Sequence, residues 1–175
     1  MALTIDQKQL IVAEVTEVAG KALSAIGAEY SGLTVAQMTA MRVKARDGGV
    51  YLRVIKNTLA RRALAETSFA CMSEALTGPL VLAFSMDDPG AAARLMRDFA
   101  KDFAKLDIKV IALGGQLVPV SDIARVASLP TREEALSQLL AVLQAPIVKL
   151  ARTFNEVPGK LVRTVAAVRD QKQAA

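Results

Sequence analysis

Residues 80–99, LVLAFSMDDPGAAARLMRDF, decide the fold class. The first six residues form a short apolar run, which is typical of a strand that is covered on both faces. Asp88 and Pro89 then predict a helix start, with Asp88 as the N-cap and Pro89 at the first helical position. Apolar residues recur every three or four positions beyond it, as in an amphipathic helix. These inward-facing residues are Ala92, Leu95, Met96, Phe99 and Phe103. A buried strand followed by an amphipathic helix indicates a layered domain of helices and strands.

Strand and helix patterns continue to alternate on both sides of this stretch. Further strands are predicted at residues 22–28, 50–55 and 108–113, the last continuing through Val118 after a Gly-Gly turn. Further helical segments are predicted at residues 6–21, 34–46, 57–65 and 71–76. Thr34 with Gln37 forms a capping box, and Asn57 is the expected N-cap of its helix. The pattern predicts an α+β fold, with a small mixed, mainly antiparallel sheet covered by helices and its strand order left open.

The pattern changes after Pro130, where strand signals end. Apolar residues recur at gaps of three or four, so one stripe runs along a single long helix. The stripe consists of Leu136, Leu140, Leu143, Ile147, Leu150, Phe154, Val157, Leu161, Val165 and Val168. Pro146 and Pro158 should bend this helix without ending it. We therefore expect a globular domain at residues 1–130 and a helical extension at residues 131–175.

The extension also contains an internal repeat. Lys149-Leu150-Ala151-Arg152-Thr153 recurs eleven residues later as Lys160-Leu161-Val162-Arg163-Thr164, and a fainter copy places Leu139 and Leu143 eleven residues before Leu150 and Phe154. Eleven residues are close to three helical turns, so each copy presents the same face. The repeat predicts equivalent binding surfaces along one helix.

Composition narrows the function classes. The 175-residue chain has 22 Lys and Arg against 17 Asp and Glu, one Cys and no His. Without His, Ser-His and Cys-His catalytic arrangements and most zinc sites are excluded, and no carboxylate pair stands out as catalytic. Cys71 is best explained as a small buried apolar residue. Since the first residues lack a continuous apolar run, we expect no signal peptide and a cytoplasmic protein. We also expect no cofactor.

The positive charge is concentrated in one segment. Between Arg42 and Arg62 there are seven basic residues and one acid, Asp47, which gives +6 against +5 for the whole chain. A strand end followed by a helix N-terminus, as at residues 54–58, also suits a phosphate. We predict RNA-backbone contacts here. The candidate RNA-binding residues are Lys8, Arg42, Arg46, Arg53, Lys56, Asn57, Thr58, Arg61 and Arg62. The alternative is that these side chains only solvate a helical face.

The apolar stripe has its own alternatives. A helix of that length reaches about 60 Å, whereas a domain of ~130 residues has a radius of gyration of about 14 Å. Most of the helix should therefore project, and its stripe should be covered by a partner. The candidate docking residues are Leu139, Leu143, Ile147, Leu150, Phe154, Val157, Leu161, Val165 and Val168. Packing on the chain's own domain, self-association and membrane-surface binding through a basic amphipathic helix remain open.

Several motifs of this sequence resemble the family of bacterial large-subunit ribosomal protein ten, the base of the ribosomal stalk. They include Gly32-Leu33-Thr34-Val35, Arg53-Val54-Ile55-Lys56-Asn57-Thr58-Leu59, Pro89-Gly90-Ala91-Ala92 and Gly159-Lys160-Leu161-Val162-Arg163-Thr164. The resemblance runs almost from end to end, and the combination of the Lys-Asn-Thr-Leu and Lys-Leu-Val-Arg elements is the most specific part of it.

The resemblance implies a non-enzymatic protein of the large ribosomal subunit. Members bind large-subunit ribosomal RNA beside ribosomal protein eleven, and their C-terminal helix carries dimers of the acidic stalk protein seven/twelve. That stalk recruits translational GTPases, and members commonly repress translation of their own messenger by binding its leader. Because the tail has two clear repeats and a faint one, we expect roughly two or three dimers here.

Overall fold

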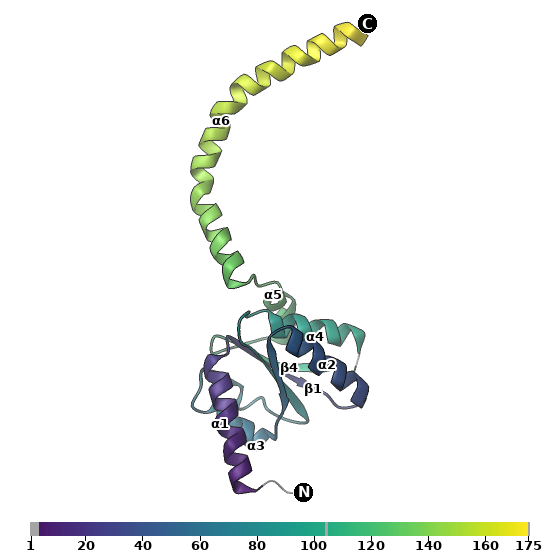
Figure 1. Cartoon of the computed structure of the whole chain (residues 1–175), viewed down its shortest axis with the longest axis vertical. Coiled ribbons are helices and arrows are strands. Elements are labelled where there is room, and N and C mark those ends of the chain that lie inside the picture. The colour runs from purple at the N-terminus through teal and green to yellow at the C-terminus, as the bar shows by residue number, and fades with distance from the viewer. Residues whose placement is uncertain (1–3, 104, 175) are drawn as a thin grey trace. The chain divides into compact units, whose positions relative to one another are not determined.

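The computed structural model describes residues 4–103 and 105–174, without the side chains of residues 157, 168 and 174. The chain divides into two units, residues 1–131 and 132–175, shown along the colour scale in Figure 1. Each unit is described by itself.

The first unit is built on a five-stranded sheet with the order β2-β3-β1-β4-β5, in which every neighbouring pair is antiparallel. The strands are β1 (Ser24–Glu29), β2 (Val50–Val54), β3 (Leu80–Ser85), β4 (Asp107–Leu113) and β5 (Gln116–Val118). The predicted α+β class is confirmed, and the predicted strands lie within two residues of the observed ones. All six residues of β3 are buried, as the apolar run indicated.

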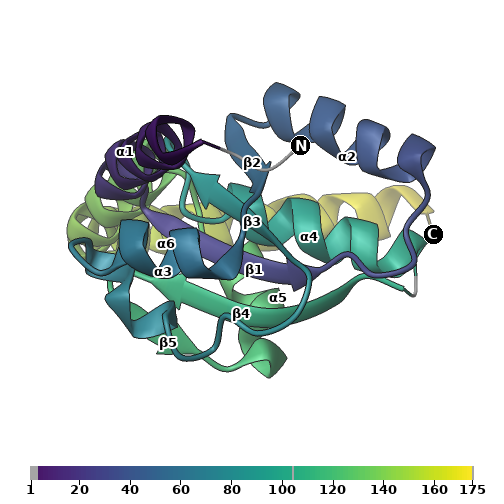
Figure 2. The ribbon, with the colours of Figure 1, turned by 90° about the horizontal axis from the view of Figure 1, so that it is seen from below.

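Helices cover both faces of this sheet (Figure 2). One face carries α1 (Ile5–Lys21), α3 (Asn57–Leu64) and the 3₁₀ turn η1 (Ser68–Met72). The other carries α2 (Val35–Asp47), α4 (Ala91–Asp102) and α5 (Ile123–Ala127), which follows the 3₁₀ turn η2 (Val120–Asp122). The capping box predicted at Thr34 and Gln37 is confirmed.

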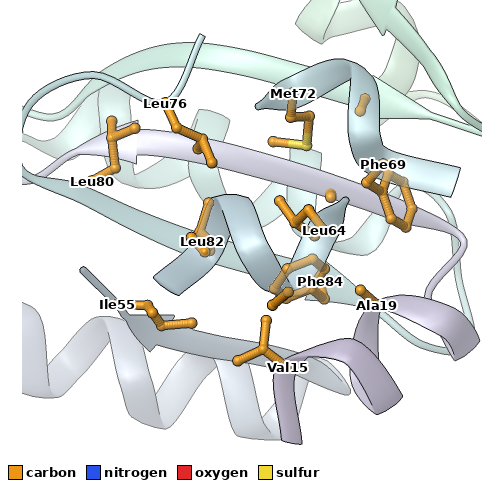
Figure 3. Packing of buried hydrophobic residues seen from close by; sticks show 14 of the residues in the cluster. Val15, Ala19, Ile55, Leu64, Phe69, Met72, Leu76, Leu80, Leu82 and Phe84 are labelled. Carbon is orange, nitrogen blue, oxygen red and sulfur yellow. The ribbon is translucent and has the colours of Figure 1, made fainter. Parts of the chain in front are cut away.

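Alternate residues of β3 supply the two apolar layers. Leu80, Leu82 and Phe84 face α1 and α3, whereas Val81 and Ala83 face α2 and α4. Figure 3 shows the first layer, where side chains from α1, α3 and η1 surround Phe84. The alternation fixes the register, because a one-residue slip would exchange the two layers.

Two predicted helix starts and one predicted helix are wrong. Asn57 is not an N-cap: Lys56 takes that position, and the Asn57 amide instead donates to the carbonyl of Gly78 at 2.9 Å. Asp88 is not an N-cap either, because α4 begins three residues later. The Asp88 carboxylate instead closes a tight turn by accepting from the amide of Gly90 at 3.0 Å. The helical piece expected at residues 71–76 is a 3₁₀ turn at Ser68–Met72, started by the hydroxyl of Thr67.

The start of α4 is capped from the sheet. The Ser85 hydroxyl, at the buried end of β3, accepts from the amide of Ala92 at 2.9 Å. Ser85→Ala should leave that buried N–H unpaired and lower the free energy of unfolding by about 1–3 kcal/mol. Urea unfolding would measure this, with Ser31→Ala in an exposed turn as the control. Equal stability of both variants would contradict this role of Ser85.

The second unit is one helix, α6 (Arg132–Ala174), of 43 residues. Its length is about 65 Å at 1.5 Å per residue. It continues through Pro146 and Pro158 as expected, and it curves along its length instead of breaking (Figure 1). Each proline removes one backbone donor, which the remaining hydrogen bonds of a long helix tolerate.

Candidate nucleic-acid interface and docking helix

The edge strand β2 lies in a cleft of about 680 Å³. All five residues of the strand line it, together with Arg42 and Arg46 from α2 and Glu14 from α1. The two α2 arginines lie one helical turn apart, are exposed and have no ion-pair partner among the described residues. The fold therefore brings Arg42 and Arg46 into the same cleft as Arg53 of β2, and all three are predicted RNA-binding residues.

Arg53 is already engaged within this cleft. Its guanidinium forms an ion pair with Glu14, and its Nη1 also donates to the hydroxyl of Tyr51 at 2.9 Å. The Tyr51 hydroxyl donates in turn to Oε1 of Glu14 at 2.6 Å. The hydrogen bond from Tyr51 is the main cause that lowers the pKa of Glu14, and the hydrogen bond from Arg53 is the second. The pKa of Tyr51 is raised, mainly by burial of its hydroxyl. Sequence reasoning missed Glu14 and Tyr51, because nothing local links residues 37 positions apart.

The segment from Lys56 to Thr58 borders a second hollow of about 370 Å³, which Tyr30 and Pro79 also line. Lys56 and Thr58 are exposed, whereas the side chain of Asn57 is held by Gly78. No side chain caps α3. The amides of Leu59 and Ala60 donate to the carbonyl of Lys56 at 2.8 and 3.0 Å. The amides of Asn57 and Thr58 are therefore the ones that could receive an anion here, and the phosphate site stays a prediction.

The remaining candidate cations differ in their contacts. Arg61 donates from Nη2 to the carbonyl of Leu76 at 2.8 Å and so holds the segment before β3. Arg62 and Lys8 lie on a groove of about 830 Å³ between α1 and α3, which Glu17 and Glu66 also line. Both cations are exposed and have no ion-pair partner in residues 4–103 and 105–174.

The seven basic residues among the predicted RNA-binding residues thus fall into two groups. Arg53 and Arg61 support the fold through contacts within the protein. Five cations lack such contacts in the described part of the chain, and they line three separate hollows: Lys8, Arg42, Arg46, Lys56 and Arg62. We call this set of residues the free-cation face. Lys44, from the same basic segment, instead lies over the ring of Phe99 at 4.7 Å.

The predicted docking residues of α6 are exposed wherever their side chains are described. Each is between 57% and 72% exposed: Leu139, Leu143, Ile147, Leu150, Phe154, Leu161 and Val165. The side chains of Val157 and Val168 lie outside the described part of the structure. The repeat has a structural counterpart, because Thr153 and Thr164 donate equivalently to the carbonyls of Leu150 and Leu161, at 2.7 and 2.8 Å.

One part of α6, Arg132–Glu156, is long and apolar enough to cross a membrane by length and composition alone. An amphipathic docking helix has the same composition, so this feature is weak evidence for a membrane role. Flotation of the full chain with liposomes would detect one.

Comparison with known proteins gives a consistent result. Residues 3–101 match the family model described as ribosomal protein L10, and residues 129–157 match the one described as ribosomal protein uL10 C-terminal region. The chain is 62% identical over its full length to the large ribosomal subunit protein uL10 of Thioalkalivibrio sulfidiphilus, 99% of which is covered. It is 59% identical to that of Alkalilimnicola ehrlichii, with both chains fully covered. With that of Coxiella burnetii, identity is 55%, covering 99% of this chain and all of the relative.

Proposed function

The chain belongs to the ribosomal protein L10 (uL10) family of the large ribosomal subunit, and from this premise we propose that it is the base of the ribosomal stalk in the bacterial cytoplasm. Members of this family are structural and not enzymatic. In this proposal the first unit binds large-subunit ribosomal RNA and α6 holds dimers of the acidic stalk protein seven/twelve. The observation that carries the proposal is the row of exposed apolar side chains along a 43-residue helix.

The RNA contacts are assigned to the free-cation face. Its five side chains come from α1, α2, the last turn of α3 and the junction before α3. Lys and Arg on several elements suit a folded RNA backbone, which is recognised by shape and phosphate contacts. Ribosomal protein eleven would bind the same RNA nearby. The same face would bind the leader of the protein's own messenger, so that surplus protein represses its own synthesis.

The docking function is assigned to the stripe of α6. Exposed leucine, isoleucine and phenylalanine side chains gain free energy when a partner covers them, at roughly 25 cal/mol per Å². The repeated copies would each receive one dimer, which gives roughly two or three dimers per chain. Several flexible acidic partners on one helix would raise the local concentration of binding sites for translational GTPases.

Co-expression with the acidic stalk protein tests both assignments. The full chain should co-purify with roughly two or three dimers in native mass spectrometry, and a chain ending at Pro130 with none. The shortened chain should still shift a stalk-base RNA fragment in a gel, because its unit has its own apolar layers. A single dimer on the complete tail would argue against the repeat, and co-purification of the shortened chain would refute the docking assignment.

A further inference from the structure

One carboxylate lies in the otherwise cationic part of the cleft beside β2. Among the residues described there, Glu14 is the acidic one and Arg42, Arg46 and Arg53 are the cations. Both oxygens of Glu14 are used: Oε1 accepts from the Tyr51 hydroxyl, and Oε2 pairs with Arg53. The guanidinium and the hydroxyl are themselves joined. The three groups close a ring of contacts between α1 and the edge strand.

The contacts of Glu14 are those that a phosphate would make. A carboxylate and a phosphodiester each present two oxygens that share a negative charge, and both accept charge-assisted hydrogen bonds from hydroxyl and guanidinium groups. The Glu14 side chain is 48% exposed and that of Arg53 is 34% exposed, so solvent reaches the ion pair. Glu14 can therefore turn into water when another anion takes its place.

We propose that Tyr51 and Arg53 form a phosphate-binding position, which Glu14 fills in the free protein and an RNA phosphodiester takes over on binding. This inference rests on the proposed RNA-binding function. Glu14 lowers the net charge of the three cleft arginines from +3 to +2, which weakens the attraction of any polyanion. A phosphate must then be placed well enough to displace the carboxylate, so Glu14 favours the correctly shaped RNA.

The test uses the full chain and a fluorescent stalk-base fragment of large-subunit ribosomal RNA, with affinity measured by anisotropy. Glu14→Gln keeps a hydrogen-bond acceptor for Tyr51 but removes the competing charge. We expect binding about fivefold tighter, the effect of roughly 1 kcal/mol for a solvent-exposed ion pair. Asp107→Asn is the matched control, since Asp107 forms a comparably exposed ion pair with Lys109 at 2.7 Å but lies on β4, away from the edge strand and its cations. It should change affinity less than about twofold.

A double-mutant cycle separates displacement from general charge. Arg53→Gln should weaken binding. Adding Glu14→Gln to it should give clearly less than the fivefold gain expected in the wild-type background, because the phosphate position is already lost and only the long-range effect of the charge remains. An equal gain in both backgrounds would show that Glu14 acts only through long-range charge, and that result would overturn the proposal. A second result would also overturn the proposal: Glu14→Gln binds the RNA no more tightly than the wild type, while the double variant Arg42→Glu, Arg46→Glu binds it more weakly. If the wild-type chain does not bind the fragment at all, the proposed RNA-binding function itself fails.

Discussion

Reversing the charge of four cations of the free-cation face is expected to abolish RNA binding while the fold stays intact. The four substitutions are Arg42→Glu, Arg46→Glu, Lys56→Glu and Arg62→Glu. These side chains are exposed and make no ion pair in the described residues, so their replacement breaks no ion pair there. Each would lose a phosphate contact and add repulsion.

The expected loss is on the order of a thousandfold in affinity, because a solvent-exposed ion pair contributes up to roughly 1 kcal/mol and four are lost. The dependence of binding on salt should also become weaker by about one unit of logarithmic slope for each contact removed. Anisotropy titrations of the stalk-base fragment at several salt concentrations measure both quantities.

A control with the same change in net charge makes this result specific. It reverses four exposed cations that lie outside the free-cation face and make no ion pair in the described residues: Lys101, Lys105, Arg163 and Lys172. That variant should keep most of the affinity, apart from a modest long-range effect. An equal loss in both variants would show that overall charge, and not this face, attracts the RNA.

The choice of substitutions depends on contacts that the sequence does not reveal. Arg53 and Arg61 belong to the same basic segment as Lys56, yet Arg53 pairs with Glu14 of α1 and Arg61 holds the carbonyl of Leu76. Replacing either would disturb the protein as well as the interface. Such pairings depend on how distant segments fold together, whereas a basic segment is a local feature of the sequence.

The same distinction explains which parts of the fold were predictable. Strands and helical faces follow from apolar periods of two and 3.6, which lie within one segment. Helix starts were less predictable, because a polar side chain such as Asp88 can hydrogen-bond elsewhere, here to the amide of Gly90. The buried Ser85 hydroxyl from β3 accepts from the first turn of α4 instead. The order of the strands was not predictable, although it decides that β2 is an edge strand and that its residues line a cleft.

The tail was predictable in more detail than the first unit for the same physical reason. A helix places residues by their spacing alone, so an eleven-residue repeat is sufficient to imply equivalent faces. The matching hydrogen bonds of Thr153 and Thr164 agree with that inference. What covers the face does not follow from spacing, and it requires an experiment with the partner.

Aspartate in the stripe of α6 should eliminate co-purification of the acidic stalk protein while RNA binding persists. The variant carries Leu150→Asp, Phe154→Asp, Leu161→Asp and Val165→Asp. All four native side chains are at least 59% exposed, so the helix loses no internal packing among the described residues. Docking would lose roughly 1.5–3 kcal/mol of apolar burial at each position, in addition to the desolvation of each new charge. Size exclusion and native mass spectrometry of the co-expressed proteins measure the result.

A matched variant tests whether the position on the helix, and not the added charge, is responsible. At about 100° per residue, Ala141, Ala145, Val148 and Ala166 lie on the side of α6 away from the stripe. Aspartate at those four positions adds the same charge to the same helix and repels an acidic partner equally, but it leaves the stripe free for docking. We expect it to retain most of the bound dimers, with circular dichroism confirming equal helix content in both variants. If the two variants lose the partner to the same extent, repulsion accounts for the loss, and the apolar stripe is not the surface that holds the stalk.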